Sequence, residues 1–332
     1  MNKQGFQEFL LNRKLNGEQV AQHIEITAQF ERYLGSLIPP LSLETATAEA
    51  TQGFVDQLIA DGANSYDNLV ALARYGRFSQ NNELYVAILE LLDGEEAFAG
   101  IYHRIGEVAG IEKRAEIFDD FLVPPLGTNS REKSRLTQVL MERLDHLVDP
   151  KTQSLIFSNS FRDLQDEYYQ EDKQKYWEIG DIDKYLEIKR EEFLAELEQI
   201  MTEGRLFFSQ EITPEVIEYV RGDLEISQGV RQDNILYVTK IPYMAKEYLA
   251  ETDPEKKRYF YCHCPWARES LRKGETIVSA KFCQCSAGFH KKAWEVIFGK
   301  PLQAEVLESV LKGDMRCRFA IHLPEEIRIG ED

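Results

Sequence analysis

The chain has 332 residues, of which 43% are hydrophobic and 29% charged, and its formal net charge is −18. This composition excludes a disordered or collagen-like chain, and the length predicts two domains of about 100 to 200 residues each. The acidic charge argues against binding to nucleic acid or to anionic membranes, because both demand a basic surface.

The N-terminal residues lack the pattern of a signal peptide, and no run of about 18 apolar residues occurs. We therefore expect a cytoplasmic protein. Thiols stay reduced in that compartment, so the five cysteines are expected to coordinate metal, to react or to pack rather than to form disulfides.

Residues 1–122 predict an all-helical domain. Apolar residues recur at helical spacing, and Asn64 and Ser65 are typical N-caps for the helical segment that follows them. The order of these helices weakly resembles the four-helix core-binding domain of tyrosine recombinases, which clamps DNA. Residues 1–100 carry 6 basic and 14 acidic side chains. This charge argues against DNA clamping, so the resemblance implies a helical bundle only.

Residues 123–200 predict a linker followed by a helical connector. The stretch 123–134 contains two prolines and a glycine, which are typical of a break between elements. A long helix follows, with charges at (i, i+4) spacing and Gly204 as its expected C-terminal stop.

Residues 201–332 predict a C-terminal α/β domain with a mixed, mainly antiparallel sheet, which makes the whole chain an α+β protein. A hairpin is expected with its turn near Gln232 to Asn234. Residues 286–299 predict a helix. Four runs read as strands by their β-branched and aromatic residues: 258–264, 277–285, 302–311 and 317–323.

All five cysteines lie within the last quarter of the chain, as Cys-His-Cys (262–264), Cys-Gln-Cys (283–285) and Cys317. Residues i and i+2 of a strand face the same side, so each pair is expected to point one way, and Cys317 shares a face with Phe319 and Ile321. If these strands share a sheet, the five sulfurs can line one side of it.

Charge and helix ends favour a site at the same place. The stretch from Glu255 to Arg318 carries 13 Lys and Arg and 7 Asp and Glu, in contrast to the acidic remainder. Cys264 precedes Pro265 and Cys285 precedes Ser286, and these followers are typical of helix N-termini. The positive end of a helix dipole favours a thiolate, or a bound anion.

Zinc in proteins takes about four thiolate or imidazole ligands. The candidate metal ligands are Cys262, Cys264, Cys283, Cys285 and Cys317, with His263, His290 and His322 in reserve. An iron–sulfur cluster would use the same ligands. Two other interpretations stay open, namely metal-free reactive thiols and cysteines that pack as small hydrophobic residues.

Other side chains in this region are candidates for ligand binding. Arg268 and Lys291 lie beside the predicted helix N-termini, where they can hold a carboxylate. Trp266 is a candidate wall of an aromatic pocket, although tryptophan is more often a core residue.

Four segments carry a resemblance to known families: TKIPY (239–243), CHCPWARES (262–270), FCQCSAGFHKKAWEVIFG (282–299) and ESVLKGDMRCRFAIHLP (308–324). They resemble a family of uncharacterised bacterial proteins along most of the chain. Over about the last 80 residues they distantly resemble the L-2-amino-thiazoline-4-carboxylate hydrolases and the 4-vinyl reductase-type ligand-binding domains.

The 4-vinyl reductase-type domains end on an acidic residue and a cysteine, then Gly-Asp and a final cysteine, and they bind zinc or small aromatic ligands there. Gly313, Asp314 and Cys317 match this ending, and Glu308 can match its acidic residue. The earlier cysteine is missing, because Ser309 stands eight residues before Cys317. This departure argues against a direct transfer of the family's zinc site, and the two Cys-X-Cys pairs are candidates to replace the missing ligand.

We therefore expect a metal-binding protein, with zinc as the first candidate, that also binds a small anionic ligand. The resemblance to the hydrolases implies an alternative, the opening of a small cyclic amidine-like acid by attack on a non-peptide C–N bond. Cys285 would then be the nucleophile or main ligand and His290 the base. A second alternative is an interaction scaffold with a structural metal. The sequence leaves the oligomeric state open.

Overall fold

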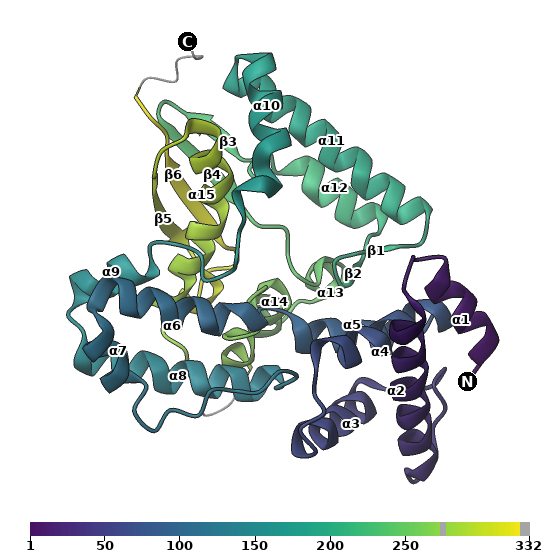
Figure 1. Cartoon of the computed structure of the whole chain (residues 1–332). Helices are drawn as coiled ribbons and strands as arrows, with labels where there is room; N and C mark the ends of the chain where they lie inside the picture. The colour runs from purple at the N-terminus through teal and green to yellow at the C-terminus, as the bar shows by residue number, and fades with distance from the viewer. Residues whose placement is uncertain (273–276, 326–332) are drawn as a thin grey trace. The chain divides into compact units, whose positions relative to one another are not determined.

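The computed structural model describes residues 1–272 and 277–325 (Figure 1). Helices dominate the chain, and the strands gather in its C-terminal part. The fold is α+β, as the sequence predicts. None of the described helices is long and apolar enough to cross a membrane.

The chain forms two compact units. Unit 1 comprises residues 1–95 and 122–133, and unit 2 comprises residues 96–121 and the chain from residue 134 onward. This division differs from the expected boundaries at residues 122 and 200. The reason is that residues 96–121 contribute Ile101, Ile105 and Ile117 to a core that they share with Leu140 and Leu144 of unit 2.

Unit 1 is helical, as expected for this part of the chain. Phe30 packs on Phe54 with ring centroids 5.0 Å apart, and Phe6 packs on Tyr75 at 4.9 Å. The hydroxyl of Ser65 accepts a hydrogen bond from the backbone N–H of Asn68, which confirms Ser65 as a helix N-cap. The helices are α1 (Lys3–Leu11), α2 (Gly17–Ser36), α3 (Ala48–Ala60), α4 (Tyr66–Ser79) and α5 (Asn82–Leu92).

Unit 2 begins with a helical part. Its helices are α6 (Glu95–Ala109) from residue 96 onward, α7 (Ile111–Ile117), α8 (Ser130–Leu147) from residue 134 onward, α9 (Pro150–Phe157), the 3-10 helix η1 (Asp166–Tyr169), α10 (Gln170–Ile179) and α11 (Ile182–Thr202). Strands β1 (Leu206–Phe207) and β2 (Gln210–Glu211) then lead to α12 (Pro214–Gly222). Helix α11 shares an apolar core with α12 through Leu197, Val216 and Val220.

The main sheet has the strand order β3-β4-β6-β5, and each neighbouring pair is antiparallel. Its strands are β3 (Val230–Gln232), β4 (Ile235–Thr239), β5 (Gln303–Glu308) and β6 (Arg318–His322). The turn between β3 and β4 has Asp233 at a φ of 53°, which confirms the predicted hairpin. A single parallel bridge joins Ile226 to Thr239.

Helix α15 (Gln284–Phe298) lies against this sheet (Figure 1). Trp294 and Ile297 of the helix share a core with Val238 of β4 and Ile321 of β6. Phe319 of β6, two residues before Ile321, packs among the cysteines. The cysteine region therefore lies on the face of the sheet that α15 covers.

Two of the four predicted strands are wrong. The first half of the run 258–264 belongs to helix α14 (Pro254–Tyr261). The Asp253 side chain caps the first turn of this helix, and Pro254 takes its first position. This N-terminal capping overrides the β propensity of the aromatic residues. The run 277–285 holds the 3-10 helix η3 (Ala280–Cys283), which passes directly into α15. The other two runs contain β5 and β6, as predicted, although the first of them ends in the 3-10 helix η4 (Val310–Lys312).

Candidate functional site

The five cysteines come from three places in unit 2. Cys262 and Cys264 follow the end of α14, Cys283 and Cys285 lie where η3 passes into α15, and Cys317 directly precedes β6. All five are free thiols. The strand alternation that the sequence predicts for the two Cys-X-Cys pairs does not apply, because both segments are helical or irregular.

Four of the five share one apolar core. Cys262 and Cys317 are buried among Val306, Val310 and Phe319, and Cys264 and Cys283 pack against the same residues. We call these four residues, Cys262, Cys264, Cys283 and Cys317, the four-cysteine cluster.

Cys285 stands apart from this cluster. It packs against a second core that contains Phe161 and Phe282, which Cys264 also touches. Its sulfur accepts a hydrogen bond from the backbone N–H of Phe161 at 3.2 Å. The structure therefore brings all five cysteines into one region but separates Cys285 from the other four.

The charges of the thiols act on one another within the cluster, and the charge of Cys285 also raises the pKa of Cys264. Burial raises the pKa of every cysteine in the four-cysteine cluster, and the charge of neighbouring cysteines raises it further at Cys264, Cys283 and Cys317. The charges of the other three members raise the pKa of Cys283, and the charge of Cys262 raises the pKa of Cys264 and of Cys317. Cys317 reaches a pKa of about 11. At pH 7 the four thiols are thus neutral without a partner cation.

Each sulfur of the cluster nevertheless accepts a hydrogen bond that favours its thiolate form. Backbone N–H groups donate to three of them: that of Cys264 to Cys262, that of Trp266 to Cys264, and that of Val310 to Cys317. The Ser309 hydroxyl donates to the Sγ of Cys283 at 3.0 Å. Hydrogen bonds also fix the backbone turn that follows Cys262 and Cys264, because the Cys264 carbonyl accepts from the backbone N–H groups of Ala267 and Arg268.

Positive charge surrounds the cluster. The charge of Lys240 lowers the pKa of Cys262 and Cys317, although burial outweighs it. The charge of Arg268 acts on Cys262 in the same direction. The guanidinium of Arg268 is buried over the rings of Tyr243 and Tyr259, at 4.7 and 5.4 Å from their centroids. Arg268 therefore lies near Cys262, with its position fixed by aromatic rings, and its role in binding a carboxylate stays a prediction.

The predicted ligand-binding residues Lys291 and Trp266 are both buried and contact other protein side chains. Lys291 is buried, forms an ion pair with Glu295 at 2.8 Å and donates to the Leu302 carbonyl at 2.9 Å. Trp266 is buried in the core beside Phe98, with ring centroids 5.0 Å apart. The charge of Lys291 is thus compensated by Glu295.

The histidines do not join the cluster as ligands in this structure. His263 donates from Nε2 to the Ile241 carbonyl at 2.6 Å, and burial lowers its pKa well below the usual value. His322 pairs with Glu305 at 2.6 Å. His290 stacks on Phe319 with centroids 5.0 Å apart, while the Cys285 sulfur is hydrogen-bonded to Phe161.

Of the two predicted helix N-termini, only the one beside Cys283 and Cys285 is found. Pro265 begins a turn that leads into the short 3-10 helix η2 (Arg268–Leu271), so no α-helix starts after Cys264. Helix α15 does start beside the second pair, with Cys283 at its cap position and Cys285 in its first turn. The dipole argument therefore holds for Cys283 and Cys285 only.

Two site residues were not singled out from the sequence as part of the cysteine site, namely Lys240 and the hydroxyl of Ser309. Ser309 stands where the 4-vinyl reductase-type ending has a cysteine, and its contact with Cys283 places that position beside a cluster sulfur. Lys240 follows β4 in the segment TKIPY, and its backbone N–H donates to the Cys317 carbonyl at 3.1 Å. Lys240 lies in the segment 239–243 and Ser309 in the segment 308–324, and the resemblance of these segments to known families could have identified both residues.

In the described ranges, no three His, Cys, Asp or Glu side chains are placed with the geometry of a metal site. The donor set of the four-cysteine cluster still fits a thiophilic metal by its chemistry, since four sulfurs share one core and each accepts a hydrogen bond. Metal coordination would require the thiol side chains to rotate toward one another.

Residues 248–328 match a family of unknown function (DUF6144). This stretch contains all five cysteines, and most of the chain lies outside it. No curated protein and no solved structure matches the chain. The resemblances to the hydrolases and to the 4-vinyl reductase-type domains therefore stay predictions, and the chain shares its cysteine region with a family whose function is unknown.

Proposed function

We propose that this protein binds one zinc ion through the thiolates of Cys262, Cys264, Cys283 and Cys317. The observation that carries the proposal is their common core, in which each sulfur also accepts a hydrogen bond. Hydrogen bonds to ligand atoms orient the ligands of metal sites and tune their basicity. An iron–sulfur cluster on the same four cysteines is the second candidate for this site.

The charges near the cluster support the same proposal. Four thiolates around a zinc ion carry a net charge of about −2, and a buried charge needs compensation. Lys240 and Arg268 both act on Cys262, so two positive charges lie on the side where this net charge would arise. Neutral thiols that only filled a core would not need these cations.

Four protein ligands leave no open coordination position, which is typical of structural rather than catalytic zinc. We therefore infer that the metal holds together the end of α14, the start of α15 and the start of β6. The hydrolase and scaffold alternatives, and an anionic ligand on Arg268, stay predictions from the sequence. The five free thiols also support a reducing compartment for the proposed function, and the cytoplasm is the expected one.

Elemental analysis of matched variants tests the proposal. The chain is purified without added metal and without a nickel-binding tag, and zinc and iron are measured per chain. Wild type and Cys285→Ser are expected to retain about one zinc per chain, whereas Cys283→Ser is expected to lose most of it, because Cys283 is a proposed ligand and Cys285 is not. Circular dichroism verifies that both variants are folded.

Equal zinc content in the two variants would contradict the four-cysteine assignment. A wild-type protein without zinc or iron, in which all five thiols react after denaturation both with and without prior chelation, would overturn the metal proposal and favour plain core packing.

A further inference from the structure

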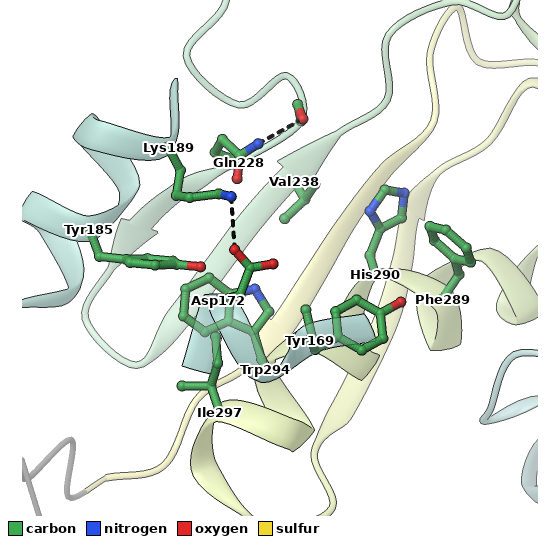
Figure 2. Close-up of a pocket in the computed structure, with 12 residues that line it drawn as sticks. Tyr169, Asp172, Tyr185, Lys189, Gln228, Val238, Phe289, His290, Trp294 and Ile297 are labelled. Carbon is green, nitrogen blue, oxygen red and sulfur yellow. Dashed lines mark hydrogen bonds and ion pairs between the residues drawn. The ribbon is translucent and has the colours of Figure 1, made fainter. Parts of the chain in front are cut away.

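Unit 2 contains a cavity of about 130 Å³, which is lined by η1, α10, α11, β4, α15 and the loop residues Ser227 and Gln228. Figure 2 shows that its lining comes from all of these elements. An apolar protein cavity of roughly 150 Å³ holds a benzene molecule, so the enclosed space is the size of one unsubstituted six-membered ring, and the substituents of a larger ring would extend through the open side. Phe289, which is 39% exposed, marks the side that is open to solvent.

Aromatic rings form one part of the lining. Tyr169, Tyr185, Trp294 and Phe289 all border the cavity. Tyr185 and Trp294 meet edge to face with centroids 5.8 Å apart, which holds both rings in fixed positions. Flat faces of this kind suit a ring-shaped ligand.

Polar groups form the other part. Asp172 pairs with Lys189 at 2.8 Å, and the Gln228 side chain donates to the Ser227 hydroxyl at 3.0 Å (Figure 2). The two charged residues therefore compensate each other, so the lining offers no net charge to a ligand. A purely apolar ligand would remove these polar groups from water without replacing their hydrogen bonds, at a cost in affinity.

His290 supplies the most specific polar group. It lines the cavity, and its Nε2 is buried without a hydrogen-bond partner among the residues that the structure describes. Burial lowers the pKa of His290 to about 3, so the ring is neutral at pH 7. Stacking on Phe319 fixes its orientation. A neutral imidazole nitrogen can donate to or accept from a hydroxyl, depending on its tautomer.

We propose that this cavity binds a neutral, polyhydroxylated six-membered ring, a ligand of the monosaccharide class. The ring faces would contact the aromatic residues, while the hydroxyls would meet His290, Gln228 and the Asp172–Lys189 pair. The proposal is independent of the metal site. It also differs from the anionic ligand expected on Arg268 and Lys291, since neither residue lines this cavity.

Saturation-transfer NMR and calorimetry with D-glucose, D-galactose and D-mannose test the proposal on the full-length protein, with phenol and benzoate as comparison ligands. At least one sugar is expected to bind, with a dissociation constant of roughly millimolar, the range of weak small-ligand binding. Ala293 lines the cavity, so Ala293→Leu is expected to fill it and abolish binding, whereas Ala293→Ser keeps the space and serves as the matched control.

His290→Phe keeps a ring against Phe319 but removes the nitrogen, and it is expected to weaken sugar binding about tenfold, the effect of one lost hydrogen bond. Thermal unfolding shows whether each variant is folded. No sugar bound by folded wild type, tighter binding of phenol or benzoate than of any sugar, or unchanged sugar binding by Ala293→Leu would each overturn the proposal.

Discussion

At the scale of single residues, the sulfurs of the four-cysteine cluster combine two opposing environments. Burial favours the neutral thiol, while hydrogen bonds from Ser309 and from backbone N–H groups favour the thiolate. A bound cation resolves this opposition, because it favours deprotonation of its ligands. The hydrogen bonds to sulfur should therefore contribute to metal affinity as well as to packing.

Ser309→Ala tests that contribution. The variant removes the hydroxyl that donates to Cys283 at 3.0 Å, and we expect a roughly tenfold to hundredfold loss of zinc affinity, as for other groups that support metal ligands. Competition with a coloured chelator measures the affinity. The same hydroxyl also accepts from the Leu311 N–H, so thermal unfolding of the metal-free proteins serves as the control for folding. Unchanged zinc affinity would remove Ser309 from the site.

The buried His290 predicts a dependence of stability on pH. Its pKa falls from 6.5 to about 3 because of burial and, secondly, because of Lys240. Between these values the unfolded chain binds more protons than the folded one, so folded-state stability falls as the pH drops below about 6.5. The loss contributed by this residue is roughly 2 kcal/mol at pH 5.

His290→Phe should abolish that contribution. All three tryptophans, Trp177, Trp266 and Trp294, lie in unit 2, so urea unfolding followed by tryptophan fluorescence reports on this unit. The decrease in unfolding free energy from pH 7 to pH 5 should be roughly 2 kcal/mol smaller in the variant than in wild type. An identical decrease in both would show that His290 is protonated freely in the folded protein.

At the scale of elements, the contact of α15 with residues 159–161 positions Cys285. Gly288 makes this contact possible, because a Cβ atom there would lie 2.4 Å from the backbone of Asn159 and of Ser160. The next residue, Phe161, donates its N–H to Cys285. The helix therefore approaches this segment closely only with glycine at position 288.

Gly288→Ala should destabilise unit 2 by about 1–3 kcal/mol, the usual cost of overpacking a core. Gly222→Ala is the control, since no atom lies within 4 Å of a Cβ there and alanine favours the helix. Urea unfolding measures both variants. Equal stability of Gly288→Ala and wild type would mean that the 159–161 segment moves aside without cost.

Sequence patterns predicted elements well where the signal was local. The β3–β4 hairpin and strand β6 follow from turn residues and alternation. The pattern failed at residues 258–264 and 277–285, where aromatic and β-branched residues favour strands. There, helix capping by Asp253 and burial of Phe282 against distant aromatic rings favoured helical conformations.

At the scale of the whole molecule, the clustering of the cysteines was predictable because all five lie close together in sequence. Their separation into four and one was not, since it depends on Phe161, more than 100 residues before Cys285. The cavity beside His290 was equally hidden, because it gathers side chains from five elements and a loop between residues 169 and 297. Long-range packing of this kind leaves no local pattern in the sequence.

Substitution with Co²⁺ tests the central claim, a four-thiolate metal site, most directly. Metal-free protein, kept under reducing conditions, is titrated with Co²⁺ while its absorption spectrum is recorded. We predict one equivalent bound, with intense sulfur-to-cobalt charge-transfer absorption and the strong visible bands of tetrahedral coordination, retained in Cys285→Ser and lost in Cys283→Ser. Weak bands of hydrated, octahedral cobalt in wild type would contradict the account.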